Sequence, residues 1–146
     1  MMNHPFIKKP PPKATGREEF GDIFLHNILS KAEKHKIPEN DLITTVTAFT
    51  AESIVSNYKE HIFKIDLPSD IIFCGGGIHN QFLMGLLKKK LPEFIISTTE
   101  KYGISPDALE AITFAILANE TLHGNFSNLP SVTGAKRKVI LGKIVP

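Results

Sequence analysis

The sequence predicts an α/β fold that is rich in helices and contains a small parallel sheet. Most of the chain places apolar residues at helical spacing. Between these stretches lie two short continuous apolar runs, Asp70–Cys74 and Phe94–Ile96, separated by one helical pattern. A strand, a helix and a strand in this order form a βαβ unit, in which the two strands pair in parallel.

The composition is that of a soluble globular protein. Of 146 residues, 42% are hydrophobic and 22% are charged, and one main domain is expected at this length. The formal charge of +2 is spread over both halves, so nucleic acid is not an expected partner. One cysteine excludes a disulfide framework, and six scattered histidines predict no metal site. No stretch approaches the roughly 20 apolar residues of a membrane span and no signal peptide is apparent, so we expect a cytoplasmic protein without a membrane partner.

Residues 1–16 predict an extended proline-rich leader, and residues 17–146 the folded lobe. Prolines lack the backbone donor that regular elements need, and three of them are consecutive at Pro10–Pro12. Thr15 and Glu18 then have the spacing of a capping box, so a helix should begin here. It should end before Pro38, with lysines near its C-terminus.

A second helix is predicted from Pro38 to Tyr58, because the apolar positions keep roughly helical spacing. The β-branched residues Thr44–Thr47 leave a strand as the alternative, but the length of the segment favours a helix.

The following elements begin with Asp70–Cys74, which is typical of a strand buried on both faces. A helix over Phe82–Lys90 should end before Pro92, and a second strand should follow at Phe94–Ile96. Ser105 is a candidate N-cap for a helix that Gly124 should close. A last strand at Lys138–Leu141 is possible.

The glycine turn Gly75–Gly77 carries the strongest indication of chemistry. Glycines after a buried strand let a ligand approach the main chain, and free amides at the start of the next helix can bind phosphate, ribose or base oxygens. A simple tight turn that needs a positive φ is an equal alternative, because the pattern is neither GxGxxG nor a P-loop. The neighbouring Cys74 is expected to be a buried core thiol.

Glu110 is the second unusual residue, because helical spacing places it beside Phe114 and Leu117 on a largely apolar helix. An exposed helix edge or an acid that supports the helix start is the commoner explanation. A carboxylate that faces a ligand is the alternative.

Five blocks occur in order along nearly the whole chain: PPPKATGREEF (Pro10–Phe20), DLITTVTAFTAESI (Asp41–Ile54), CGGGIHNQFLM (Cys74–Met84), YGISPDALEAITFAILA (Tyr102–Ala118) and NLPSVTGAKRKVILGKIVP (Asn128–Pro146). In this order and spacing they resemble the C-terminal part of the anhydro-N-acetylmuramic acid kinase family. The resemblance implies a lobe of the actin/hexokinase-like, or ribonuclease H-like, architecture. It also implies ATP-dependent phosphorylation of 1,6-anhydro-N-acetylmuramate with hydrolytic ring opening, in bacterial cell-wall recycling, with ATP and Mg²⁺ in the complete enzyme.

By this resemblance, Gly75, Gly76 and Gly77 match glycines that line the adenosine site, with Asn80 at the start of the following helix. Glu110 matches an acid near the sugar pocket. The family's phosphate-binding loop and the segment that bears its aspartate base are not found in this sequence. No catalytic residue is therefore assigned.

We expect the chain to supply adenosine contacts and part of the sugar site, and to be inactive alone. Its expected partner is a complementary N-terminal kinase half, or further copies of itself in a homo-oligomer. The strands that precede Asp70–Cys74 in such a lobe would be missing, which would leave one side of this strand unpaired. The alternatives are a non-enzymatic kinase remnant or interaction module, and a small independent nucleotide-binding protein.

Overall fold

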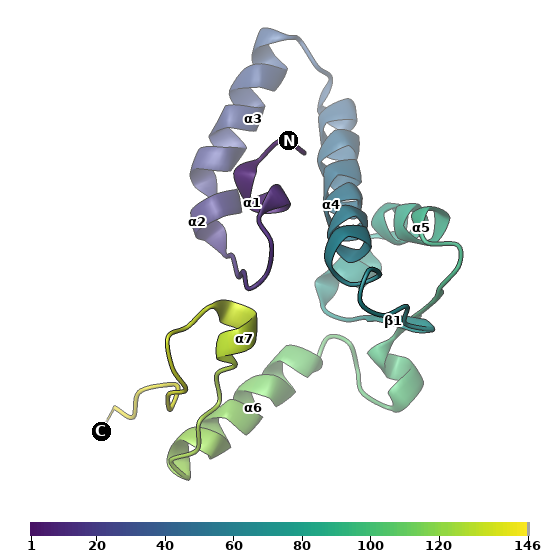
Figure 1. Ribbon diagram of the computed structural model, residues 1–146. Coiled ribbons are helices and arrows are strands. Elements are labelled where there is room, and N and C mark those ends of the chain that lie inside the picture. The colour runs from purple at the N-terminus through teal and green to yellow at the C-terminus, as the bar shows by residue number, and fades with distance from the viewer. Residues whose placement is uncertain (146) are drawn as a thin grey trace. The chain divides into compact units, whose positions relative to one another are not determined.

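The computed structural model describes residues 1–145, which divide into two compact units (Figure 1). The first unit comprises Met1–Pro10, Thr15–Pro68 and Gln81–Glu93. The second comprises Pro11–Ala14, Ser69–Asn80 and the chain from Phe94 onward. The predicted helix-rich α/β class with a small parallel sheet is confirmed. Within the described residues, no helix combines the length and apolarity needed to cross a bilayer.

The first unit is helical. Its elements are α1 (Pro5–Lys8), α2 (Arg17–Phe20), α3 (Asp22–Lys34), α4 (Glu39–His61) and α5 (Gln81–Lys90). The helix predicted from Pro38 is confirmed as α4, and the strand alternative is wrong. The hydroxyls of Thr44, Thr45 and Thr47 donate to carbonyls four residues earlier at 2.6–2.9 Å, so these β-branched residues fit within the helix.

The N-terminal leader is not extended throughout, because α1 forms one helical turn within it. Pro5 occupies the first helical position, where its missing N–H costs no hydrogen bond. The His4 side chain accepts a hydrogen bond from the Phe6 N–H at 3.3 Å. The stretch between Pro5 and Pro10 contains no further proline and has His4 as its N-cap, so it can form a helical turn. The number of prolines in residues 1–16 did not indicate this.

The predicted capping box does not form, and the helix that follows is interrupted. Glu18 accepts a hydrogen bond from the Gly16 N–H at 2.8 Å, and Gly16 rather than Thr15 is the N-cap of α2. The chain leaves helical geometry at Gly21, where an added Cβ would lie 2.1 Å from the Arg17 carbonyl oxygen. Only glycine fits this close approach, so one predicted helix becomes α2 and α3.

The core of the first unit lies around α4 and α5, which pack on each other. Its buried members are all aliphatic: Ala32, Ala51, Val55, Leu87 and Leu91. An aromatic cluster joins the N-terminal arm to α2, α3 and α4 through His4, Phe20, Phe24 and Phe49, with ring centroids 4.8–6.1 Å apart. Contacts of this kind add to the area that the rings bury.

The second unit contains the sheet. Its elements are β1 (Asp70–Phe73), the 3₁₀ helix η1 (Gly76–His79), β2 (Ile95–Thr98), the 3₁₀ helix η2 (Thr99–Tyr102), α6 (Leu109–Leu122) and α7 (Pro130–Thr133). β1 and β2 pair in parallel, with Asp70 opposite Ile95 and Phe73 opposite Thr98. Both strands therefore end at the same edge of the sheet.

Two expectations for this unit are wrong. β1 is not buried on both faces: Ile71 is buried, whereas Ile72 is 45% exposed. β1 pairs only with β2 in the described chain, so it is an edge strand. The segment Lys138–Leu141 is not a strand, because the Asn128 side chain binds it instead. Asn128 accepts from the Val139 N–H at 2.7 Å and donates to the Arg137 carbonyl at 2.9 Å.

The helix predicted from Ser105 begins four residues later, at Leu109. The Ser105 carbonyl accepts a hydrogen bond from the Ala108 N–H at 3.1 Å, which forms a turn before the helix. The end is as predicted, because Gly124 follows α6 with a left-handed φ of +70°.

Candidate functional site

The glycine turn follows the carboxyl end of β1. Gly75 has φ +76° and ψ 175°, a conformation that is essentially restricted to glycine. Its N–H donates to the carbonyl of the buried Pro106 at 3.2 Å, and its own carbonyl accepts from the Ile78 N–H at 3.2 Å. The backbone conformation of the turn therefore explains why residue 75 is a glycine.

Gly76 and Gly77 differ from Gly75, because neither has a positive φ. A Cβ added to Gly76 would meet no atom within 4 Å. A positive φ thus calls for glycine at Gly75 alone, and the space beside Gly76 is open. An open main chain of this kind can accept the close approach of a ligand.

A side-chain hydrogen bond joins the glycine turn to the segment that leads into α6. The His79 Nε2 lies 2.8 Å from the Asp107 Oδ1, and both side chains are largely exposed. Together with the Gly75–Pro106 hydrogen bond, it brings residues 75–79 and 106–107 into one cluster. Sequence reasoning missed Pro106 and Asp107 as partners of the turn. The predicted parallel strands carried a usable signal, because the segments after two parallel strands meet at one edge of the sheet.

Asn80 ends η1, and its N–H donates to the Gly77 carbonyl at 3.2 Å. It directly precedes α5 in the sequence, as the resemblance implies. Its side chain is exposed. Asn80 therefore closes the glycine turn on its C-terminal side.

Glu110 lies in the first turn of α6, three residues after Asp107, and is exposed. Within residues 1–145 its carboxylate makes no hydrogen bond or ion pair, and none joins it to the glycine turn. Because water reaches the carboxylate, the desolvation cost expected from its apolar neighbours does not arise. An acid near a helix N-terminus is also favoured by the helix dipole.

Cys74 is exposed, which corrects the expectation of a buried core thiol. It follows the last residue of β1, where the chain leaves the sheet. Among residues 1–145 no group of three or more His, Cys, Asp or Glu side chains is placed to hold a metal ion, so no residue is assigned to Mg²⁺.

Comparison with known proteins identifies the family of the chain. The sequence model of one family, described as anhydro-N-acetylmuramic acid kinase, matches residues 1–146. The chain is 49% identical over 146 residues to an anhydro-N-acetylmuramic acid kinase of Clostridioides difficile (strain 630), covering 100% of this chain and 38% of that protein. It is 44% identical over 144 residues to the kinase of the same name from Caldanaerobacter subterraneus subsp. tengcongensis, covering 99% and 36%.

The kinase of that name from Bacillus cereus (strain G9842) is 49% identical over 145 residues, which cover 98% of this chain and 37% of that protein. The chain thus spans a little over a third of the length of these relatives. Nearly every residue of the chain takes part in each match. The chain therefore belongs to the anhydro-N-acetylmuramic acid kinase family.

Proposed function

We propose that this chain supplies the adenosine contacts and part of the sugar site of an ATP-dependent 1,6-anhydro-N-acetylmuramate kinase. The observation that carries the proposal is the family match over the whole chain, combined with its coverage of only 36–38% of its relatives. The remainder of the catalytic machinery lies in the part of the kinase that the chain does not match. The proposed setting is the cytoplasm and the recycling of bacterial cell-wall amino sugars.

The glycine turn is the proposed adenosine contact, formed by Gly75, Gly76 and Gly77 with Asn80 beyond them. Gly75 sets the turn through its positive φ, and Gly76 leaves open space against which a ribose or base can lie. The His79–Asp107 pair and the Gly75–Pro106 hydrogen bond hold this segment in place. A turn fixed in this way binds its ligand with less loss of conformational entropy.

Glu110 is the proposed sugar contact. A carboxylate accepts hydrogen bonds from sugar hydroxyls, and the exposed Glu110 has no partner among residues 1–145 that would compete. ATP supplies the transferred phosphoryl group. Mg²⁺ is proposed for the complete kinase, and no residue of this chain is assigned to it.

Inactivity of the isolated chain follows from the absence of both the phosphate-binding loop and the aspartate base from this sequence. Phosphoryl transfer depends on positioned phosphates and an oriented nucleophile. The proposed architecture is one lobe of the actin/hexokinase-like fold. The small parallel sheet supports this only at the level of an α/β class.

A coupled assay of ATP consumption with 1,6-anhydro-N-acetylmuramate tests the proposal on the isolated chain. We expect no turnover above the background without sugar. Turnover above about 1 s⁻¹, which is ordinary for an enzyme, would contradict the assignment of the missing machinery to another part of the kinase.

A further inference from the structure

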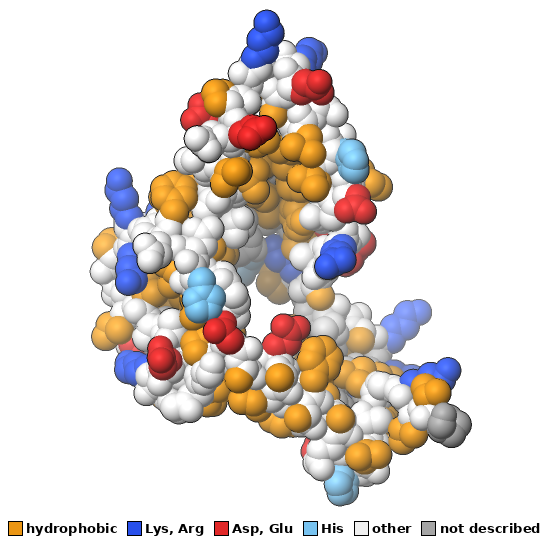
Figure 2. Space-filling view, turned by 180° about the vertical axis from the view of Figure 1, so that it is seen from behind, with side chains coloured by type: hydrophobic (Ala, Val, Ile, Leu, Met, Phe, Trp, Pro, Cys, Tyr) orange, Lys and Arg blue, Asp and Glu red, His pale blue; other side chains and the backbone are white. Residues whose placement is uncertain are grey.

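α6 is largely apolar, and its apolar residues are not confined to one side. Nine of its fourteen residues, Leu109–Leu122, are aliphatic or aromatic, and none of the fourteen is buried. Phe114 is 62% exposed, Ile116 57% and Leu122 72%. In the space-filling view, hydrophobic side chains line this helix and the C-terminal tail (Figure 2). A helix that is hydrophobic all round is normally buried inside a larger protein.

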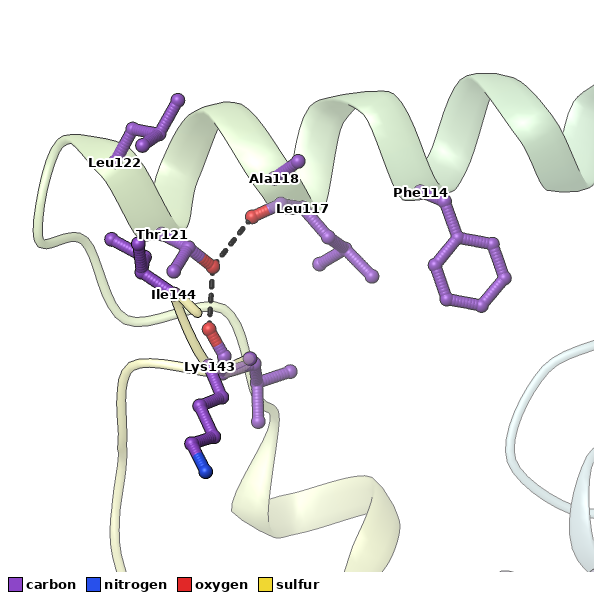
Figure 3. A pocket seen from close by; sticks show the side chains of 9 residues that line it. Phe114, Leu117, Ala118, Thr121, Leu122, Lys143 and Ile144 are labelled. Atoms are coloured by element: carbon purple, nitrogen blue, oxygen red, sulfur yellow. Dashed lines mark hydrogen bonds between the residues drawn. The ribbon is translucent and has the colours of Figure 1, made fainter. Parts of the chain in front are cut away.

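A pocket of about 450 Å³ lies between α6 and the C-terminal tail (Figure 3). Phe114, Leu117, Ala118 and Leu122 line it from the helix, with Leu141 and Ile144 from the tail. Because apolar side chains make up most of the lining, the pocket suits large apolar side chains better than a solvated sugar or nucleotide.

The polar side chains of the pocket are not placed to bind a polar ligand. The Thr121 hydroxyl already lies within hydrogen-bond distance of the Leu117 and Leu141 carbonyl oxygens. Lys143 points away from the helix (Figure 3). Gly142 lets the tail approach closely, because a Cβ there would lie 3.3 Å from the Thr121 hydroxyl oxygen. The described residues thus form an apolar pocket that is open to solvent.

We infer that α6 and this pocket form the docking surface for the part of the kinase that the chain lacks, which inserts apolar side chains beside Phe114. The chain covers only 38% of its Clostridioides difficile relative, so three fifths of that protein lie outside the match and can cover α6. An exposed apolar surface of this extent marks an interaction site in a soluble protein. This inference rests on the proposed function, because it takes the missing part of the kinase as the occupant.

Binding between two purified proteins tests the inference. The probe is the part of the Clostridioides difficile relative that this chain does not match, labelled with a fluorophore and titrated with the chain while anisotropy is recorded. Phe114→Lys is the test variant, because Phe114 is 62% exposed and a lysine there replaces an aromatic side chain of the proposed surface by a charge. Phe126→Lys is the control, since Phe126 is 64% exposed but lies outside α6 and does not line the pocket.

We expect Phe114→Lys to weaken the Kd at least about tenfold, because the aromatic anchor is lost and a charge enters the interface. Phe126→Lys should leave the Kd within about twofold. Equal effects of the two variants, or no binding of the wild-type chain at about 100 μM, would overturn the inference. A wild-type homodimer that Phe114→Lys dissociates would also overturn it, because a second copy would then cover the surface. The same holds if Phe114→Lys lowers the thermal midpoint and Phe126→Lys does not, because the chain itself would then cover the surface.

A kinase assay on the same mixtures separates this inference from the proposed function. Binding that depends on Phe114 without any sugar phosphorylation supports the docking surface and contradicts the proposed function. If the mixture phosphorylates the sugar and Phe114→Lys does not change the rate, the proposed function is supported and the docking surface is contradicted.

Discussion

Substitution of neighbouring glycines by alanine should separate the turn from the open surface beside it. Gly75 has φ +76° and ψ 175°, where a residue with a Cβ is strained by about 1–3 kcal/mol. Gly76 has no positive φ, and an added Cβ meets no atom within 4 Å. We therefore expect Gly75→Ala to lower the free energy of unfolding by about 1–3 kcal/mol. Gly76→Ala should leave it unchanged or raise it by about 0.4–1 kcal/mol, since alanine restricts the unfolded chain.

Urea denaturation followed by circular dichroism measures both free energies. Wild-type, Gly75→Ala and Gly76→Ala proteins are compared under one condition, and the slopes of the transitions are checked for equality. Equal destabilisation by the two substitutions would refute this reading of the turn, because it would mean that Gly76 is also needed for folding. No cost at Gly75 would show that the turn relaxes to accommodate a side chain.

Three further predictions concern the two proposed contacts and the core. Gly76→Val should weaken ATP binding by about tenfold or more when the chain is combined with the part of the Clostridioides difficile relative that it does not match. The branched side chain fills ligand space that is otherwise open. Unchanged affinity in isothermal titration would favour a simple turn. Glu110→Gln keeps the shape and removes the charge, so it should lower kcat/KM for the anhydro-sugar while ATP affinity and the thermal midpoint stay nearly unchanged, because Glu110 is exposed. A lower midpoint with normal sugar kinetics would make Glu110 a structural acid. Leu87→Ala should cost about 2–5 kcal/mol in urea denaturation, because Leu87 is fully buried, whereas Leu67→Ala at a position 68% exposed should cost under about 0.5 kcal/mol.

Local pattern predicted most elements, because periodicity and flanking glycines or prolines act over a few residues. α4, α5 and β1 lie close to the predicted positions, β2 (Ile95–Thr98) overlaps the predicted Phe94–Ile96, and Gly124 closes α6. The break at Gly21 escaped prediction because its cause is a close approach to the Arg17 carbonyl. A glycine within a helical pattern does not reveal such a contact.

Local pattern alone did not identify the partners of the glycine turn, although the predicted parallel pairing of the strands indicated the end of the sheet at which they lie. Asp107 lies 28 residues from His79, and nothing in its own neighbourhood indicates that it pairs with the glycine turn. Cys74 appeared to be buried because it continues an apolar run, yet β1 ends one residue earlier and the thiol is exposed. The sequence pattern could not predict that α6 is exposed. A largely apolar helix is expected to be buried, and the pattern does not show which part of the protein covers it.

Complementation of kinase activity tests the central claim most directly. The chain is mixed with the part of the Clostridioides difficile relative that it does not match, and phosphorylated sugar is measured by mass spectrometry with ATP, Mg²⁺ and 1,6-anhydro-N-acetylmuramate present. The proposed function predicts product from the mixture and none from either protein alone. If both proteins are folded and form a complex but no product appears, the proposed function is contradicted. Product formed by this chain alone would also contradict it.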